Sequence, residues 1–529
     1  MILKKALPWF FVISLSLPAL AQDHVATKFA KRISASDAKK HLTILSSDEY
    51  EGRETGKPGA EKAAEYIAAQ FKKLGLLAPV NGSYFQNFPL WENVFEVKAF
   101  NINGKSLTYG KDFNLSTIPN VTTIKTNEIV YIGYGIDSET YKDLEGTDIA
   151  GKVVLLINRD EPIDKGKLAK NEEITDWSAS RLKRISYIQS KNPALILAVS
   201  PEENDATENY PISFPGKGRL ALKPTSYLKT TQAAPVANIS PSVAELFLKN
   251  SAKTYEALKA SINEISAPKT QTVKVEFNAD FGIQVKQVNS KNVLGFLPGT
   301  DLKEEILVFS AHYDHIGVSE TGADKINNGA DDDGSGTTAV IELARAFTKA
   351  KNRGKGPRRS ILFLTVSGEE KGLLGSEWYS EHPVFPLAQT ITDLNIDMIG
   401  RIDPAHAANP NYCYLIGSDK LSTDLHKISE NANSIYTKLS IDYKFNDPND
   451  PERIYYRSDH YNFAKHNIPI IFYFNGVHED YHKPSDEVSK INFDLLVKRA
   501  QLVYYTGWDL ANRNKRPLVD VKSDMPPKR

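Results

Sequence analysis

The sequence predicts an α/β protein in which a mainly parallel, mixed central sheet is sandwiched by helices and is interrupted by an inserted, mostly β domain. Two observations predict this class. Between residues 268 and 512, continuous apolar runs alternate with helical segments, which is typical of parallel strands covered on both faces. Residues 119–267 instead contain short apolar strands separated by glycine, proline and charged stretches, which is typical of a separate β-rich unit.

Composition limits the possible functions. A chain of 529 residues suggests two or three domains. Lys+Arg and Asp+Glu number 65 each, and this balance argues against a nucleic-acid binder, which needs a basic surplus. The single cysteine, Cys413, rules out an internal disulfide and a structural zinc site built from cysteines. Because Tyr414–Ile416 indicate a strand beside it, we expect Cys413 to be buried as a small apolar side chain.

Residues 1–21 resemble a secretory signal peptide. Two lysines near the start precede an apolar run, and Ala19-Leu20-Ala21 forms a cleavage site of the small-x-small type. A membrane anchor is the alternative, but the run contains two prolines and is shorter than the roughly 20 residues that span a bilayer. No later apolar run is long enough to span. We therefore expect an exported protein, periplasmic or secreted, with no membrane span after cleavage.

The expected elements follow in chain order. Apolar residues recur at helical spacing over 38–45 and 60–74, and Ser46–Arg53 between them indicates a polar turn. Further along, strands and helices are expected at 129–132, 153–157, 194–199, 236–239, 243–248 (helix), 273–277, 306–309, 337–350 (helix), 361–366, 391–396 and 468–474. We assign residues 22–118 and 268–512 to one discontinuous domain, 119–267 to the insert and 513–529 to a polar tail.

Acidic and histidine residues cluster directly after the strands of the second region. The clusters are His312-Tyr313-Asp314-His315, Gly329 to Gly336 with three consecutive aspartates, Glu369-Glu370, Asp397 and Tyr481-His482. Each alone has an ordinary interpretation as a helix cap, a solvated loop or a surface histidine. Together they follow strand ends that meet at one edge of an open sheet, where buried charges must be paired or bind metal. Imidazole and carboxylate are ligands for zinc, and a bridging carboxylate would serve a two-metal site.

In order and spacing, these five clusters resemble the motifs of the co-catalytic di-zinc aminopeptidases, which include aminopeptidase Y and the secreted bacterial aminopeptidases. The segment Leu45–Gly56 is also similar to that family, and Asp148–Leu156 resembles part of a protease-associated (PA) domain. The resemblance covers nearly the whole mature chain. It implies a zinc-exopeptidase fold with a PA-like insert, and an enzyme that removes N-terminal residues from peptides or proteins.

The resemblance also implies a set of ligands for two Zn²⁺. Asp332 would bridge the two ions, with His312 and Asp397 completing one site and Glu370 and His482 completing the other. The three consecutive aspartates leave the register open by one, and Asp332 fits the family spacing best. In related enzymes the peptide bond after the bridging aspartate is cis, so we expect a cis bond between Asp332 and Asp333.

Three further roles are implied by the same resemblance. Glu369 would be the general base, Asp314 would orient His312, and Tyr481 would stabilise the oxyanion. Other histidines compete for these roles. On an extended segment His315 would point away from the side chain of His312, and His460 would have a structural or pocket role. His478 lacks the neighbouring residues that mark His482.

Two other classes of function stay open at this point. The same fold carries glutaminyl cyclases and carboxypeptidases, and it carries non-catalytic receptors that lack metal ligands. A PA-like insert favours a peptidase, and retention of all five ligand candidates with Glu369 favours an enzyme. The side-chain preference, the role of the insert and the oligomeric state do not follow from the sequence.

Overall fold

The computed structural model describes residues 22–116, 121–139, 141–158, 177, 180–200, 218–224, 233–265 and 267–525. The expected signal peptide, residues 1–21, lies outside these ranges. The chain divides into two compact units: unit 1 comprises Met1–Pro89 and Asn289–Arg529, and unit 2 comprises Leu90–Val288. Two strands, β1 (Phe85–Ile102) and β9 (Gln271–Leu297), each contribute residues to both units. Unit 2 thus contains the expected insert and also the stretches of β1 and β9 that flank it.

Unit 1 is built on a mixed, mainly parallel sheet. Its strands follow the spatial order β14, β13, β15, β12, β10, β11, β9. Pairing is parallel between β10 and β11, β10 and β12, β12 and β15, and β13 and β14, and antiparallel at β11 with β9 and at β13 with β15. The bounds are β10 (Leu302–His312), β11 (Arg359–Val366), β12 (Thr390–Ile396), β13 (Tyr412–Ile416), β14 (Ser440–Asp442) and β15 (Ile470–Phe474).

Helices cover both faces of this sheet. They are α1 (His24–Ala30), α2 (Ala35–Leu45), α3 (Pro58–Leu74), α9 (Gly336–Lys351), α10 (Leu374–Glu381), α11 (Thr423–Ala432), α12 (His460–Ala464) and α13 (Phe493–Asn512). Short helical turns are η1 (Asp48–Arg53), η3 (Ala330–Ser335), η4 (Leu387–Gln389), η5 (Pro404–His406), η6 (Asn433–Thr437), η7 (Lys444–Asn446), η8 (Ile454–Tyr456) and η9 (Val488–Lys490).

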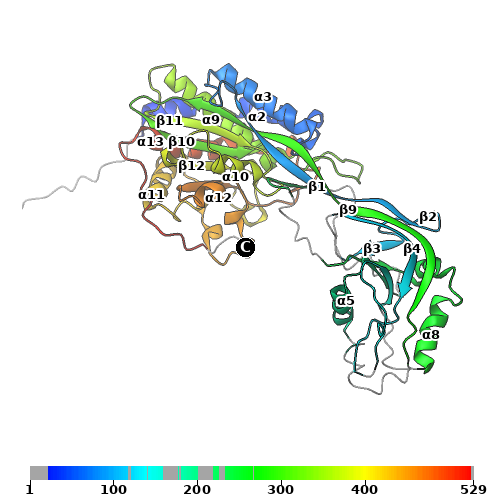
Figure 1. Ribbon diagram of the computed structural model, residues 1–529. Coiled ribbons are helices and arrows are strands. Elements are labelled where there is room, and N and C mark those ends of the chain that lie inside the picture. The colour runs from blue at the N-terminus through cyan, green and yellow to red at the C-terminus, as the bar shows by residue number, and fades with distance from the viewer. Residues whose placement is uncertain are drawn as a thin grey trace, which may run out of the picture. The chain divides into compact units, whose positions relative to one another are not determined.

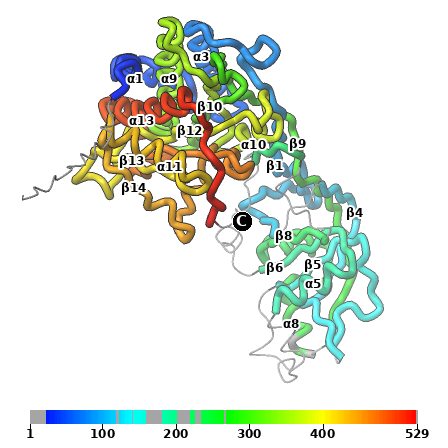
Figure 2. The backbone as a smooth tube through the Cα atoms, turned by 90° about the vertical axis from the view of Figure 1, so that its left-hand side faces the viewer, coloured from blue at the N-terminus to red at the C-terminus, as the bar shows by residue number. Residues whose placement is uncertain are grey.

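Alternating strand residues supply two separate cores, one on each face. Leu307, Phe309 and Ala311 of β10 pack in the cluster that includes α1, α2, α3, α9 and α13, whereas Ile306 and Val308 pack with α10 and α12. In Figure 1, α2, α3 and α9 lie above the strands and α10 and α12 lie below them. Figure 2 shows the blue helix α1 beside the red helix α13, so segments from opposite ends of the chain lie side by side.

Unit 2 is a smaller α/β unit. Its strands β4 (Val121–Tyr131), β5 (Val153–Ile157), β6 (Leu195–Val199) and β8 (Val236–Ile239) pair in parallel in that order. Antiparallel partners are β9 on β4, β3 (Phe113–Leu115) on β8, and β2 (Lys105–Ser106) and β7 (Arg219–Ala221) on β1. Its described helices are α5 (Arg181–Ser190), α7 (Pro241–Leu248) and α8 (Tyr255–Ile265).

The expected fold class and most expected elements are confirmed. The strands expected at 153–157 and 236–239 have those bounds, and the helix expected at 60–74 is α3. Pro58 stands in its first turn, where a missing N–H costs nothing, and Gly75 ends it with a φ of 80°. Cys413 is buried in β13, as expected. Among the described helices, none combines the length and apolarity that crossing a membrane requires.

Candidate metal centre

The acidic and histidine residues singled out in the sequence meet at the carboxyl edge of the unit 1 sheet. His312 is the last residue of β10, Asp397 directly follows β12, and Glu369 and Glu370 follow β11. The loop after β15 carries His482, and the turn η3 before α9 carries Asp332. The side chains of all of these except His482 are largely buried.

Asp332 lies between two groups of side chains. Its Oδ1 is 3.4 Å from His312 Nε2, and its Oδ2 is 3.1 Å from His482 Nε2. On the first side, Asp397 Oδ1 lies 3.6 Å from His312 Nε2. On the second side, Glu370 Oε2 lies 3.1 Å from His482 Nε2. The two oxygens of one carboxylate therefore face two different sets of possible metal donors.

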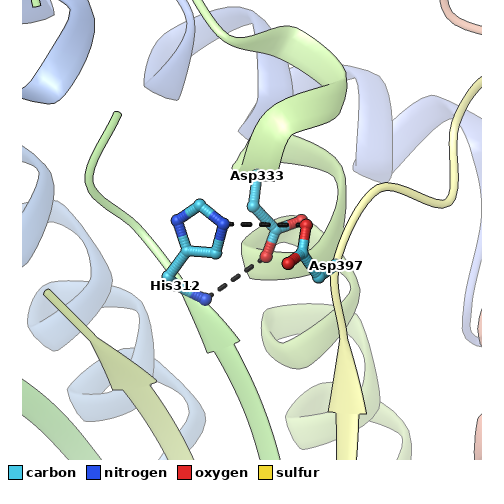
Figure 3. Close-up of side chains that lie close together, drawn as sticks. All are labelled: His312, Asp333 and Asp397. Atoms are coloured by element: carbon cyan, nitrogen blue, oxygen red, sulfur yellow. Dashed lines mark hydrogen bonds and ion pairs between the residues drawn. The ribbon is translucent and has the colours of Figure 1, made fainter. Parts of the chain in front are cut away.

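The three consecutive aspartates have different surroundings. Asp333 accepts hydrogen bonds from the backbone N–H groups of His312 (3.2 Å), Gly336 (2.8 Å) and Met398 (3.1 Å). Figure 3 shows its carboxylate between the His312 backbone and Asp397. Asp331 accepts from the Gly400 N–H at 2.6 Å and lies 3.2 Å from His478 Nε2. The carboxylates on either side of Asp332 are thus occupied in holding loops together. The expected cis bond between Asp332 and Asp333 is confirmed.

His315 contradicts the expectation that it points away. Its Nδ1 is 2.8 Å from Glu370 Oε1 and 3.7 Å from Asp332 Oδ2. The expectation assumed an extended segment, but β10 ends at His312 and the chain then turns to pair with the N-terminal segment, where the His315 N–H donates to the Arg53 carbonyl. His315 therefore joins the group of Asp332 and Glu370, and its ring holds one oxygen of Glu370 while the other faces His482.

A purely geometric grouping of possible donors gives two sets. Donor atoms of His312, Asp333 and Asp397 lie within 4.8 Å of one another, and so do those of His315, Asp332 and Glu370. Asp333 accepts hydrogen bonds from three backbone N–H groups, so its carboxylate has a structural role. Asp332 is therefore the residue that connects the two sets.

Several buried polar atoms in this cluster fit a metal better than they fit the protein alone. Among the described residues, His312 Nε2, His315 Nε2 and Asp332 Oδ2 are buried and have no hydrogen-bond partner. Leaving such atoms unsatisfied is costly. Imidazole nitrogens and carboxylate oxygens are the donors that a zinc ion takes when cysteine is absent. The donor set and the unsatisfied atoms therefore both fit a divalent metal of this type.

The electrostatics of the cluster reflect strong coupling between its members. Burial raises the pKa of Asp332, but the adjacent imidazoles of His312 and His482 outweigh burial and hold that pKa well below its usual range. Conversely, burial lowers the pKa of His482, whereas Asp332 and Glu370 together raise it to about 10. Burial also raises the pKa of Glu369 well above its ordinary value, and the neighbouring carboxylates Glu370 and Asp397 add to this effect.

Glu369 and Asp314 lie beside the first group. Glu369 Oε2 is 3.9 Å from His312 Nε2, and the Glu369 N–H donates to Asp314 Oδ1 at 3.3 Å. His312 Nδ1 lies 3.0 Å from the Asp314 carbonyl oxygen and 3.7 Å from its carboxylate. The backbone of Asp314 is therefore the nearer partner of the imidazole, and its carboxylate connects His312 to the segment that carries Glu369.

Tyr481 lines a cleft that opens beside Glu369. Apolar side chains line the same cleft, among them Met398, Ile454 and Phe472. The Tyr481 ring stacks on His482 with centroids 3.8 Å apart, and its hydroxyl accepts a hydrogen bond from Arg457 at 3.3 Å. Burial raises the pKa of Tyr481 above its ordinary value, so the phenol keeps its proton at neutral pH.

The remaining histidines lie outside the cluster, as expected. His460 is fully buried, stacks on Phe472 and faces the Tyr455 carbonyl at 2.8 Å, which gives it a structural role. His478 pairs with Asp331 rather than with Asp332.

Sequence reasoning missed two sets of residues that build this site. Arg53 is buried and donates to the carbonyls of Leu45, Tyr313, Asn328 and Gly329, which ties the N-terminal segment to the loops that carry His312 and Asp332. The other set is Asp393 and Asn395 on β12, which precede Asp397 at two-residue spacing. Because alternate strand residues share a face, the polar pattern Asp-x-Asn-x-Asp in an apolar strand was the signal.

Comparison with known proteins agrees with this geometry. Residues 292–507 match Peptidase family M28. Transferrin receptor protein 1 of Gallus gallus is 24% identical over 59% of this chain and 39% of that protein. Leupeptin-inactivating enzyme 1 of Streptomyces exfoliatus is 27% identical over 41% of this chain and 48% of that protein. The chain thus spans less than half the length of these curated relatives.

Among solved structures, an aminopeptidase from Aneurinibacillus sp. strain AM-1 is similar over 95% of this chain and all of that chain, with 19% identity and a TM-score of 0.48. The region that matches the family contains all five clusters of acidic and histidine residues. Residues 292–507 are thus similar to Peptidase family M28.

Proposed function

We propose that this protein is a metallo-exopeptidase, specifically an aminopeptidase that hydrolyses N-terminal residues from peptides or proteins and uses two zinc ions. The observation that carries the proposal is the position of Asp332. Its two oxygens face two histidines that belong to separate groups of donors. A carboxylate in that position suits a pair of metals about 3.5–4 Å apart, the spacing of two-metal aminopeptidases.

The proposed ligands divide between the two groups. His312 and Asp397 would hold one ion, Glu370 and His482 the other, and Asp332 both. When bound, the ions would supply Lewis acidity toward the scissile carbonyl and would lower the pKa of a bound water. His315 would fix the orientation of Glu370 through its hydrogen bond to Oε1.

The protein's own side chains would move the protons. Glu369, whose Oε2 lies 3.9 Å from His312 Nε2, would accept a proton from the attacking water and return it to the leaving amine. Asp314 would hold Glu369 and His312 in fixed positions relative to each other, because its carboxylate contacts the Glu369 backbone N–H and the His312 ring. Tyr481 would donate its hydroxyl proton to the developing oxyanion, since Arg457 already donates to its oxygen.

Location and the second unit belong to the same proposal. We propose that the protein is exported after cleavage near Ala21 and acts in the periplasm or outside the cell. We further propose that residues 119–267 form a PA-like domain. The proposal for this domain is supported by the resemblance of Asp148–Leu156 to PA sequences and by the parallel β-rich unit in which those residues lie.

Two rival activities can be separated from aminopeptidase activity by blocking substrate ends. Acetylation of the N-terminus abolishes hydrolysis by an aminopeptidase, and C-terminal amidation abolishes hydrolysis by a carboxypeptidase. A glutaminyl cyclase would instead convert an N-terminal glutamine without releasing a residue. Release of the first residue from a free but not an acetylated peptide is the expected result.

Zinc content tests the metal part of the proposal and the receptor alternative. The protein purified without chelator should contain about two zinc ions per chain, and it should hydrolyse at least one member of a panel of aminoacyl reporter substrates. A chain that binds no zinc and cleaves no reporter would be a receptor or scaffold rather than an enzyme.

A further inference from the structure

A continuous line of hydrogen bonds extends from Asp397 into the core beneath the site. The Ser458 hydroxyl donates to Asp397 Oδ2 at 2.7 Å, and the Asn395 amide Nδ2 lies 2.8 Å from the Ser458 oxygen. Asn395 Oδ1 is 2.9 Å from the Ser310 hydroxyl, which is also 2.7 Å from Asp393 Oδ1. Asp397 and Asp393 are thus connected through three neutral side chains.

The strands explain how this line arises. Asp393 and Asn395 alternate along β12 and share one face, which continues to Asp397 just beyond the strand end. Ser310 of β10 is the register partner of Asn395 in the adjacent parallel strand. Asp393, Asn395 and Ser310 have no exposed surface, and Ser458 is 1% exposed. Buried polar groups in such an environment must satisfy one another.

The number of available protons determines which groups donate and which accept along this chain of hydrogen bonds. The Ser310 hydroxyl has one proton and lies within hydrogen-bond distance of two oxygens, Asn395 Oδ1 and Asp393 Oδ1. The amide oxygen of Asn395 can only accept, so it takes the Ser310 proton. The contact between Ser310 and Asp393 then needs a proton from Asp393, which a carboxylic acid can supply and a carboxylate cannot.

If the hydrogen bonds ran in the opposite direction, Asp397 would lose a hydrogen-bond donor. If Asp393 were ionised, Ser310 would donate to it, and the Asn395 amide would have to rotate so that its NH₂ donates to Ser310. The Ser458 proton would then go to Asn395 Oδ1, and Asp397 Oδ2 would lose its donor. The three neutral side chains can therefore donate a hydrogen bond to only one of the two aspartates. If Asp397 binds metal, it must be the ionised aspartate that accepts this hydrogen bond.

We propose that Asp393 is a neutral carboxylic acid in the folded protein and that it acts as a positioning residue, orienting the Asp397 carboxylate through Ser310, Asn395 and Ser458. The metal-orienting part of this inference rests on the proposed function, since it takes Asp397 as a ligand. The protonation of Asp393 stands on the hydrogen bonds alone.

The surroundings of Asp393 agree with a neutral acid. Its second oxygen, Oδ2, is buried and has no hydrogen-bond partner among the described residues, which is far less costly for a neutral acid than for a carboxylate. Burial raises the pKa of Asp393 well above its ordinary value, Asp459 raises it further, and the hydrogen bond to Ser310 lowers it only in part.

Infrared spectroscopy tests the protonation directly. The difference spectrum between wild type and D393N, both free of metal at neutral pH, should contain the carbonyl stretch of a protonated carboxylic acid that is lost in the variant. A carboxylate band in its place would overturn the proposal. This measurement needs neither zinc nor substrate, so its outcome is independent of whether the protein is a peptidase.

Zinc affinity tests the positioning role. D393L and S310A should each weaken zinc binding by about 10–100-fold, the usual loss when a hydrogen-bond partner of a ligand is removed. D393N should recover most of the affinity that D393L loses, because an amide NH₂ donates to Ser310 as the acid does. S380A is the matched control, since the buried Ser380 hydroxyl donates within α10 to the Glu377 carbonyl.

Each outcome has a distinct meaning. Equal zinc affinity of wild type, D393L and S310A would overturn the positioning role. An affinity of D393N as low as that of D393L would show that the charge of Asp393 matters and would overturn its neutrality. If D393L does not fold, S310A and D393N answer the same question. If wild-type protein binds no zinc, the proposed function fails while the infrared result still decides the protonation.

Discussion

Units 1 and 2 use the same kind of parallel strand but place different side chains at the strand ends. β5 and β6 of unit 2 are as completely buried as β11 and β12 of unit 1. In unit 2, β5, β6 and β8 are followed by Asn158, Ser200 and Ser240, which are neutral. In unit 1, Asp397 directly follows β12, His312 is the last residue of β10, and Glu369 and Glu370 follow β11 after Ser367 and Gly368.

The buried acidic groups of the two units also differ in how they are satisfied. Asp143 of unit 2 accepts hydrogen bonds from the Ile136 N–H at 2.9 Å and from the Tyr141 hydroxyl at 3.0 Å, one on each oxygen. In unit 1, Asp332 Oδ2 has no hydrogen-bond donor among the residues that the structure describes. No group of potential metal ligands occurs in the described part of unit 2. The buried aspartate with fewer hydrogen-bond donors therefore lies among the candidate metal ligands, and a buried parallel sheet alone does not produce such a site.

The largest expected effect separates catalysis from metal binding within unit 1. Replacing Glu369 with Gln should lower kcat by about 10²–10⁴-fold, since general-base catalysis contributes that much, while zinc content stays near that of wild type. Steady-state kinetics and metal analysis measure the two quantities. Glu381→Gln, at an exposed position at the end of α10, is the matched control. A Glu369→Gln enzyme with wild-type kcat would show that the base is another residue.

Metal removal should distinguish the two units. At a free zinc concentration 100-fold above Kd, bound metal stabilises the folded state by about 2.7 kcal/mol, and chelation removes this contribution. Hydrogen exchange should then increase in the segments around His312, Asp332 and Glu370, and should stay unchanged in β5, β6 and β8. Equal increases in both units would contradict the assignment of the metal to unit 1.

The pH dependence of unit 2 should reveal Asp143. Burial raises the pKa of Asp143 to about 7, although its hydrogen bonds to Ile136 and Tyr141 oppose this effect. The folded state thus binds a proton between pH 4 and 7 that the unfolded state has released, so stability falls as pH rises through that window. The slope is at most about 1.4 kcal/mol per pH unit.

Hydrogen exchange of β5 and β6 against pH measures this slope, and Asp143→Asn should flatten it. An unchanged slope in Asp143→Asn would place the titrating group elsewhere.

The smallest expected effects should be equal in the two units. Ser240 caps α7 in unit 2 by accepting from the Val243 N–H, and Asn492 caps α13 in unit 1 by accepting from the Leu495 N–H. Replacing either residue with Ala should cost about 1 kcal/mol of local stability, measured by exchange of the first-turn amides. A much larger loss in one unit would show that the cap does more than close its helix.

Much of this structure could be predicted from local patterns, and the exceptions have physical causes. Strands β5 and β8 follow from short apolar runs bounded by turn residues. His315 was placed wrongly because the alternation rule applies only within a strand, and β10 ends three residues before it. The edges of unit 2 depend on β1 and β9, whose lengths follow from pairing with distant strands.

Local sequence patterns also predicted only part of the candidate metal centre. The five clusters after the strands indicated a metal centre, and the order of these clusters indicated a family. The choice between Asp332 and its neighbours, however, depends on which carboxylates receive backbone N–H groups. The direction of the hydrogen bonds from Asp393 to Asp397 requires the positions of Ser310 and Ser458, which lie on other segments.

The hydrogen bonds of Arg53 set an order for assembly during synthesis. Its guanidinium reaches the Gly329 carbonyl, 276 residues later in the chain. At about 5–20 residues per second, a ribosome makes Gly329 roughly 14–55 s after Arg53. Unit 2 is one uninterrupted segment and is complete before Gly329 is made. The N-terminal segment therefore cannot complete its contacts until then, and the candidate metal centre, which includes His482, cannot form until nearly all of the chain has emerged.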